Sequence, residues 1–257
     1  MGGEGRGFGP VRHLLLDHGP QVFLKSRCLF RLAPFHSCNY SMKREPLAIK
    51  HVFWDWNGTL LDDARLCASI INDILEDHGL DSISFEQYRQ TFNFPVSSYY
   101  KRLGLSSIGV SFEQTSSEFI QNYQLRWKGC SLQKHAISTL RQIADLGIPQ
   151  SIITAGKESF LDDYIKHYEL GNYFCGLVGV DHIHASGKIA RAIEYAKGLN
   201  LGSGEVLVVG DTTHDHEVGS AMSAHVLLFS KGHHPIERLE KLGSPVISCL
   251  STVLEHL

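Results

Sequence analysis

Five polar residues have types and spacing that could carry out phosphoryl transfer: Asp55, Thr154, Lys188, Asp211 and Asp215. Carboxylates without neighbouring cysteines are the ligands that a hard cation such as Mg²⁺ prefers. One aspartate could serve as an anionic nucleophile while the cation, the hydroxyl and the ammonium neutralise and bind the phosphoryl oxygens. Because these residues lie far apart in the sequence, their joint use depends on the elements that carry them.

Each of these residues lies at or after the end of a predicted strand or near a helix start. Short apolar segments at 48–56, 149–156, 177–180, 205–211 and 225–230 predict strands, and amphipathic segments between them predict helices. This alternation predicts an α/β fold, a Rossmann-like parallel sheet with helices on both faces. In such sheets ligands bind at the carboxyl ends of the strands, so we expect the five side chains to share one crevice.

The stretch between the first two predicted strands contains helical patterns only. Apolar residues recur at helical spacing in 63–78, and Ser84 and Ser111 each precede an acidic first turn. Residues 93–100 predict a break between these helices. We therefore expect an inserted all-helical cap at 65–130, and an α/β core built from 46–64 and 131–257.

Residues 1–41 differ from the rest of the chain. They hold five basic and two acidic residues, a net charge of +3, and open on a glycine-rich segment without periodicity. We expect an irregular N-terminal extension that is dispensable for function, with a basic transit peptide as the alternative interpretation.

Composition excludes several classes of protein. With 43% hydrophobic residues, the chain can bury a core, and no apolar run approaches the length of a membrane span. A net charge of −3 argues against non-specific nucleic-acid binding. Six scattered cysteines without a CxxC pair fit a reducing compartment, so we expect a cytoplasmic protein. The oligomeric state has no sequence signature.

Four motifs in a fixed order resemble those of the haloacid-dehalogenase-like superfamily, over residues 49–257. They are VFWDWNGTLLDD, SIITAG, Lys188 and GDTTHD. The helical insert is similar to that of the small-cap subclass, which includes phosphoglycolate phosphatases. The resemblance implies a Mg²⁺-dependent phosphomonoester hydrolase that acts on a small phosphorylated metabolite.

The resemblance also implies a role for each motif residue. Asp55 would be the nucleophile, forming an aspartyl-phosphate. The Mg²⁺ ligands would be Asp55, the main-chain carbonyl of Asn57, Asp211 and Asp215. The phosphoryl oxygens would be held by Thr154, the amide of Ala155 and Lys188. Gly58 would let the backbone approach the phosphate closely.

Asn57 departs from the family pattern, because phosphatases of this superfamily carry a second aspartate there. That aspartate protonates the leaving alkoxide and then activates water, which an amide cannot do. Three alternatives stay open: a slow phosphatase that uses His214, His216 or a cap residue as the acid, a substrate that needs little protonation, or a catalytically impaired phosphate-binding protein. We favour a working hydrolase.

Other polar and aromatic residues have simpler interpretations. Asp62 and Asp63 are expected to cap the helix that follows. The pair His233–His234 is expected in an exposed turn, and the His182–His184 segment in a loop rather than a zinc site. Packing between cap helices is favoured over a pocket for Phe92, Phe94, Tyr99 and Tyr100.

Overall fold

The computed structural model describes residues 49–181 and 187–257. The chain divides into two units, Met1–Lys43 and Arg44–Leu257, and every described residue belongs to the second. The expected extension at 1–41 and the segment 182–184 therefore lie outside the described residues.

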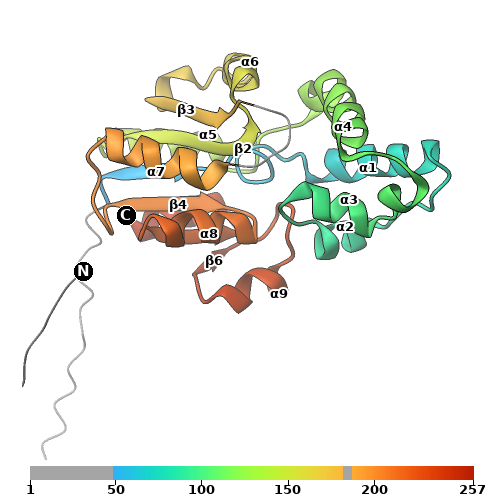
Figure 1. The fold of residues 1–257 in the computed structure, drawn as a ribbon. Helices are drawn as coiled ribbons and strands as arrows, with labels where there is room; N and C mark the ends of the chain where they lie inside the picture. Colours follow the sequence, from blue (N-terminus) through green and yellow to red (C-terminus); the bar gives the residue numbers. More distant parts are fainter. Residues whose placement is uncertain (1–48, 182–186) are drawn as a thin grey trace, which may run out of the picture. The chain divides into compact units, whose positions relative to one another are not determined.

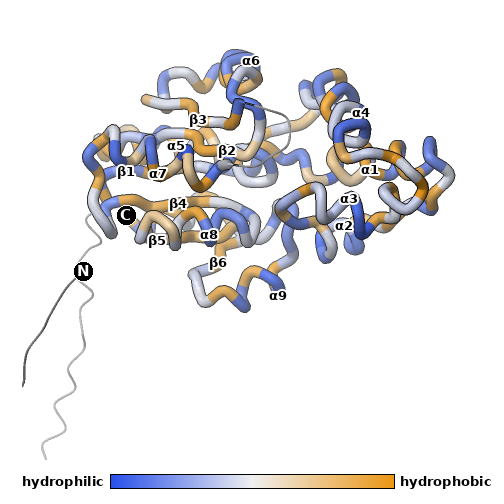
Figure 2. The backbone as a smooth tube through the Cα atoms, in the orientation of Figure 1, coloured by the Kyte–Doolittle hydropathy of each residue, from blue (hydrophilic) through white to orange (hydrophobic). Residues whose placement is uncertain are grey.

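One sheet of six parallel strands forms the centre of the described unit, in the order β3-β2-β1-β4-β5-β6. The strands are β1 (His51–Trp54), β2 (Gln150–Lys157), β3 (Gly176–Val180), β4 (Val206–Gly210), β5 (His225–Phe229) and β6 (Val246–Ile247). Strand β4 is apolar along its length, as Figure 2 shows, and is buried throughout. Strands of this kind need cover on both faces, which the helices supply.

Helices cover the two faces of the sheet (Figure 1). On one face α7 (Lys188–Gly198) and α8 (Thr213–Ala221) pack on Phe53 and Val208. On the other face α5 (Ala136–Asp145), α6 (Leu161–His167) and the 3₁₀ helix η6 (Leu250–His256) bury a cluster that includes Val52 and Leu207. Neighbouring strand residues thus alternate between two apolar layers. The predicted parallel α/β core is confirmed.

The helices between β1 and β2 lie together at the end of the sheet where β1 ends (Figure 1). They are α1 (Ala64–Asp77), α2 (Phe85–Thr91), α3 (Val96–Arg102) and α4 (Phe112–Arg126). Helix α1 packs against α2 and α4, and α3 packs against α4. This arrangement confirms an all-helical cap, while its boundaries at 65 and 130 stay a prediction.

The predicted break at 93–100 is wrong in its extent. The interruption is short, because α3 begins at Val96 directly after a cis Phe94–Pro95 bond. Pro95 suits the start of a helix, since it lacks an N–H that would have no partner there. The proline thus separates α2 from α3 without ending the helical segment.

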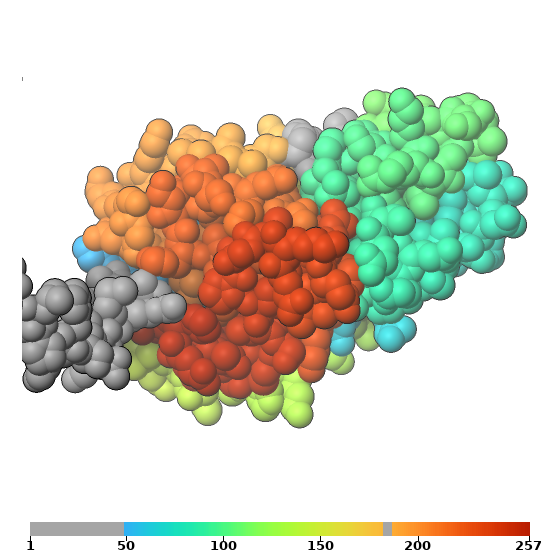
Figure 3. Space-filling view, turned by 90° about the horizontal axis from the view of Figure 1, so that it is seen from below, coloured from blue at the N-terminus to red at the C-terminus, as the bar shows by residue number. Residues whose placement is uncertain are grey.

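Cap and core meet through the loop after β5. Arg89 of α2 donates hydrogen bonds to the carbonyls of Ser230, Gly232 and His234 at 2.7, 3.0 and 2.6 Å. From the core, Arg238 of α9 (Ile236–Leu239) donates to the carbonyl of Phe92 at 2.6 Å. The C-terminal segment accordingly abuts the cap in Figure 3. Within the described residues, no helix has the length and apolar character needed to cross a membrane.

Candidate active site

The strand order brings the predicted site residues to one edge of the sheet. Strand β1 pairs with β2 on one side and with β4 on the other. Asp55 directly follows β1, Asp211 directly follows β4, and Thr154 lies in the second half of β2. Because parallel strands end at the same edge, the three side chains lie at adjoining strand ends.

Lys188 connects two of the three carboxylates. It is the first residue of α7, and its Nζ lies 2.5 Å from Oδ1 of Asp55 and 2.5 Å from Oδ1 of Asp215. The second oxygen of Asp215 accepts hydrogen bonds from the main-chain N–H and the hydroxyl of Thr212, at 2.9 and 2.8 Å. All four residues are buried. The start of α8 therefore holds Asp215 in place, and α7 supplies the cation between the aspartates.

Asp211 is held by two loops. Its Oδ1 accepts a hydrogen bond from the Thr59 hydroxyl at 2.9 Å, and its Oδ2 accepts one from the His233 N–H at 2.5 Å. Two glycines make room for this carboxylate, because a Cβ on Gly58 or Gly232 would lie 2.3 or 2.1 Å from Oδ2. Gly58 also has a φ of +76°, which glycine adopts without strain.

The three aspartates fit a divalent cation. Oxygen atoms of Asp55, Asp211 and Asp215 all lie within 4.8 Å of one another. Burial raises the pKa of Asp55 well above its usual value and that of Asp211 to about 6, while Lys188 outweighs burial and lowers the pKa of Asp215. A cation among these oxygens would offset the burial and mutual repulsion. The all-oxygen donor set suits Mg²⁺.

A cavity of about 150 Å³ extends from Asp55 and Lys188 into the cap; Asp211 and Asp215 are not among the described residues that line it. Asp55, Thr154, Ala155 and Lys188 line one part of it, as the predicted roles require. The Thr154 hydroxyl accepts a hydrogen bond from the Gly156 N–H at 3.1 Å. Nine aromatic side chains line the remainder: Tyr88, Phe92, Phe94, Tyr99, Tyr100, Phe119, Tyr123, Phe160 and Tyr164.

Two expectations about the lining need correction. Gly58 is not among the described residues that line the cavity; its N–H instead donates to Oδ1 of Asp63 at 2.8 Å. The aromatic residues of 92–100 pack on one another, as expected, but they line the cavity as well. The cap helices meet at their aromatic faces over the end of the sheet, so the same rings pack on one another and line the cavity.

Asn57 belongs to a buried network that sequence reasoning missed. Its Nδ2 donates hydrogen bonds to Oδ2 of Asp63 at 2.6 Å and to the Tyr123 hydroxyl at 2.7 Å. The Tyr123 hydroxyl in turn donates to Oδ2 of Asp63 at 2.7 Å. Asp63 occupies the N-cap position of α1 but makes no capping bond, so the predicted cap is wrong. Its carboxylate turns instead toward the Asn57 loop, which offers two donors, the Asn57 amide and the Gly58 N–H, and toward the Tyr123 hydroxyl of α4.

His233 completes this network, and the expected exposed turn is wrong. The imidazole is buried, with Nδ1 at 2.8 Å from the Tyr88 hydroxyl and Nε2 at 3.6 Å from Oδ1 of Asp63. Burial alone would lower its pKa, but Asp63 and Asp211 raise it to about 9. The imidazolium and Asp63 therefore form a buried ion pair at neutral pH.

His234 is buried as well, but as a neutral imidazole. Its Nδ1 accepts a hydrogen bond from the Thr213 N–H at 3.0 Å, and its Nε2 faces the Phe92 carbonyl at 3.0 Å. Burial lowers its pKa to about 3. Both histidines are buried because the loop after β5 lies beneath the cap, a contact with no local sequence signal.

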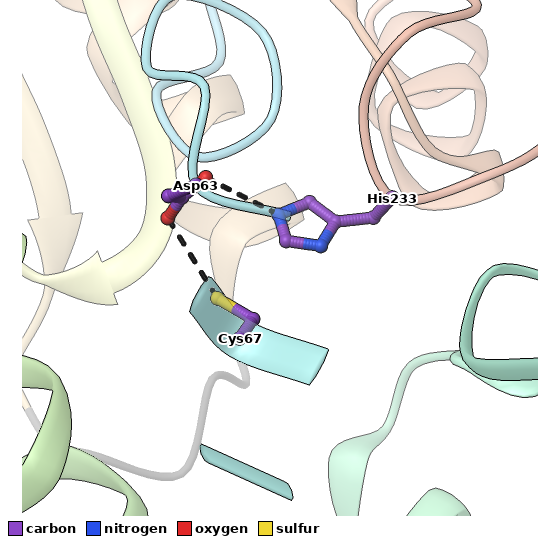
Figure 4. Close-up of side chains that lie close together, drawn as sticks. All are labelled: Asp63, Cys67 and His233. Atoms are coloured by element: carbon purple, nitrogen blue, oxygen red, sulfur yellow. Dashed lines mark hydrogen bonds and ion pairs between the residues drawn. The ribbon is translucent and has the colours of Figure 1, made fainter. Parts of the chain in front are cut away.

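Asp63, Cys67 and His233 form a second cluster with metal-ligand chemistry (Figure 4). The Cys67 thiol donates to Oδ2 of Asp63 at 3.7 Å, and burial raises its pKa well above the usual value. The carboxylate already accepts bonds from the Asn57 loop and from Tyr123. These groups satisfy one another, so the cluster needs no ion.

The histidines considered as replacement acids lie elsewhere. His214 has Nδ1 at 2.8 Å from Glu217, and its ring stacks on Phe94 at 4.7 Å. The Nδ1 of His216 lies 3.0 Å from the Ser244 hydroxyl. Neither is among the described residues that line the cavity. The structure therefore does not bring either histidine to the predicted phosphoryl site.

Comparison with known proteins supplies the family. The model of the haloacid dehalogenase-like hydrolases matches residues 52–229. The chain belongs to this family. Within the haloacid dehalogenase-like hydrolases it is 22% identical over 194 residues to phosphoglycolate phosphatase of Rhodobacter capsulatus, covering 73% of this chain and 88% of the relative. It is 23% identical over 208 residues to N-acetylmuramic acid 6-phosphate phosphatase of Pseudomonas putida, covering 78% of this chain and 92% of the relative.

A solved structure shows the same fold. A haloacid dehalogenase-like family protein of Streptococcus pneumoniae superposes with a TM-score of 0.68 at 19% identity, covering 81% of this chain and 98% of the other. Together these comparisons confirm the expected family and the enzyme class, a phosphatase of the haloacid-dehalogenase type. The names of the two relatives refer to different phosphate esters, so these comparisons indicate the class of enzyme and no single substrate.

Asp63, Tyr123 and His233 are the site residues that sequence reasoning missed. One positional signal was available for His233, because it follows β5, a strand that ends at the same edge as β1 and β4. Tyr123 had none, since any of several faces of α4 could have met the core.

Proposed function

We propose that this hydrolase cleaves phosphomonoesters of small metabolites with Asp55 as the nucleophile and Mg²⁺ as the metal. The observation that carries the proposal is the position of the Lys188 ammonium, 2.5 Å from both Asp55 and Asp215 in a cavity that also exposes Thr154. A buried cation beside a buried carboxylate at a cavity floor suits an anionic nucleophile that must meet an anionic substrate.

The residues proposed to hold Mg²⁺ are Asp55, the main-chain carbonyl of Asn57, Asp211 and Asp215. When bound, the ion supplies positive charge that offsets the repulsion between Asp55 and the phosphoryl group. An oxygen of Asp55 attacks phosphorus, the bond from phosphorus to the leaving oxygen breaks, and an aspartyl-phosphate forms. Thr154, the Ala155 amide and Lys188 bind the phosphoryl oxygens. Water then attacks phosphorus, which releases phosphate and regenerates the carboxylate.

Asn57 bears on the rate of both steps. Its amide nitrogen donates both hydrogens, one to Asp63 and one to Tyr123, and an amide cannot give up a proton at neutral pH. We therefore expect slow turnover when the leaving alkoxide needs protonation. The alternative is a catalytically impaired protein that binds phosphate esters without cleaving them.

Phosphoglycolate, the ester named for the Rhodobacter capsulatus relative, is one small metabolite to test. A cytoplasmic location, inferred from the cysteine pattern, also stays a proposal. So does the absence of nucleic-acid partners.

Phosphate release by the full chain, with Mg²⁺ and a panel of small phosphomonoesters, tests the proposal. Turnover that disappears on metal chelation and in Asp55→Asn supports it. Trapping by rapid acid quench, followed by peptide mass analysis, should find the phosphoryl group on Asp55. Turnover that survives Asp55→Asn would exclude the covalent mechanism, and binding without turnover would favour the impaired protein.

A further inference from the structure

The cap part of the cavity has a wall of aromatic rings. Phe92 meets Tyr99 edge-on, with ring centres 5.3 Å apart, and meets Phe94 edge-on at 5.5 Å. Tyr88 meets Tyr99 in the same way at 6.2 Å. Rings in edge-to-face contact favour a further ring beside them, because aromatic pairs add attraction beyond the area that they bury.

One face of α4 shows how far this wall extends. Ser116, Phe119, Ile120 and Tyr123 all line the cavity, and their spacing places them on a single face of the helix. Tyr123 marks the end near the nucleophile, through its hydrogen bond with Asn57. Ser116 lies seven residues earlier, about 10 Å along the helix axis. A two-carbon leaving group would leave most of this length unfilled.

The cavity as a whole, from its phosphoryl end at Asp55 and Lys188 to the cap, has a volume of about 150 Å³. The described lining of its cap part is mostly aromatic, which suits a flat apolar ring. At the far end, the Ser116 hydroxyl is buried and has no hydrogen-bond partner among the described residues. A polar substituent on a bound ring could satisfy it.

The charges of the described lining do not suit a carboxylate in the cap part. Lys188 and His233 are already paired with buried aspartates. Lys157 is the last residue of β2, the strand that also carries Thr154 and Ala155, and its Nζ lies 5.5 Å from the ring centre of Phe160, which belongs to the core and not to the cap. A carboxylate among the remaining rings would lose its hydration without gaining an ionic partner, which is costly.

We propose that the cavity selects phosphomonoesters whose leaving group carries a flat apolar ring on a short linker, in preference to leaving groups that carry a carboxylate. The inference rests on the proposed function, because Asp55, Thr154 and Lys188 position the phosphoryl end. The rings of the cap then bind the leaving group, and α4 sets its length.

The test compares phenethyl phosphate, ethyl phosphate and phosphoglycolate with the full chain and Mg²⁺. Phenethyl and ethyl phosphate release similar alkoxides, so their difference reports ring binding rather than leaving-group chemistry. We expect kcat/KM for phenethyl phosphate to exceed both others at least ~30-fold, mainly through KM, because the ring is removed from water. Calorimetry should show the same order for two non-hydrolysable ligands, phenethylphosphonate above phosphonoacetate.

Two variants of α4 locate the ring. Phe119→Ala should lower the ratio of phenethyl to ethyl phosphate kcat/KM about tenfold, and Ile120→Ala, which removes less area, about threefold. Leu125→Ala on the same helix is the control, since Leu125 is 82% exposed and does not line the cavity. It should leave the ratio unchanged. Thermal unfolding of each variant shows whether it is folded.

The outcomes separate the inference from the proposed function. Turnover of phosphoglycolate equal to or above that of phenethyl phosphate would overturn the inference and leave the phosphatase mechanism standing. Absence of turnover on every ester, with no phosphoryl group on Asp55, would overturn the proposed function. In that case phosphonate binding decides the inference: a preference for phenethylphosphonate that Phe119→Ala abolishes supports it, and equal binding of the two ligands overturns it.

Discussion

Asn57→Asp tests whether the buried carboxylate of Asp63 needs an uncharged hydrogen-bond donor at position 57. In the structure, Nδ2 of Asn57 lies 2.6 Å from Oδ2 of Asp63. The substitution puts two carboxylate oxygens at that separation. Two full charges so placed repel each other by roughly 6 kcal/mol at an effective dielectric constant of about 20. Since this exceeds the free energy of protonating one carboxyl group at neutral pH, the pair keeps one proton.

Because the Asn57→Asp protein must keep that proton to stay folded, the substitution should lower the unfolding free energy by an amount that depends on pH. The retained carboxyl has a folded-state pKa above its unfolded value, so the loss is absent below that unfolded value and grows as the pH rises. Holding a carboxyl protonated costs at most about 4 kcal/mol at pH 7 and about 1.5 kcal/mol at pH 5. We therefore expect Asn57→Asp to lose between ~2 and ~4 kcal/mol of unfolding free energy at pH 7, and less at pH 5.

The double substitution Asn57→Asp/Asp63→Asn should recover most of this loss. It restores one amide and one carboxylate at the same two positions, so the coupling free energy between the sites should be ~2 kcal/mol. Urea unfolding of the wild type, both single variants and the double variant at pH 5, 6 and 7 measures it. Asn122→Asp is the control, because the Asn122 amide faces a main-chain carbonyl instead of a carboxylate.

Activity gives a second readout of the same proton. A carboxyl that stays protonated beside the cavity supplies the acid that an amide lacks, so Asn57→Asp should raise turnover of alkyl phosphates by ~10-fold or more. Intact mass must be checked before each assay, because deamidation at Asn57–Gly58 would create the same carboxylate. An Asn57→Asp variant as stable as the wild type at pH 7, or a loss that does not change with pH, would refute the reasoning.

Metal removal and Asp55→Asn should each reduce phosphate release to background, as followed by a colorimetric assay; residual turnover in either would contradict the proposed mechanism. Gly58→Ala should destabilise the protein by ~2 kcal/mol or more, because φ is +76° and the new Cβ would collide with a buried carboxylate; urea unfolding that matches the wild type would count against this. Stability should fall on the order of 2 kcal/mol between pH 6.5 and 5 because burial lowers the pKa of His234 to about 3, so only the unfolded state takes up that proton. His234→Gln should reduce this fall in unfolding free energy. Part of the fall that remains in the variant should come from His51, whose pKa burial lowers to about 4.

The sheet and the end of the cavity lined by Asp55 and Thr154 followed from the sequence by itself. Short apolar strands that alternate with helices specify a parallel sheet, and parallel strands end at one edge. The polar residues near the strand ends could therefore be predicted to lie together. Asp55 and Thr154 line one cavity, and an oxygen of Asp211 lies within 4.8 Å of one of Asp55. These inferences succeed because they depend on local periodicity and one topological rule.

The cap face over the cavity was decided only by the tertiary structure. Periodicity predicts that a helix has an apolar face, but it does not say which element that face meets. Whether Tyr123 reaches Asn57, and whether His233 and His234 are buried, depends on how the cap sits on the loop after β5. That contact joins segments more than 100 residues apart, such as Arg89 and Ser230, and no local pattern encodes it. The position of Asp55, the proposed nucleophile, could thus be predicted from the sequence, whereas the environment of Asn57 and the aromatic wall required the fold.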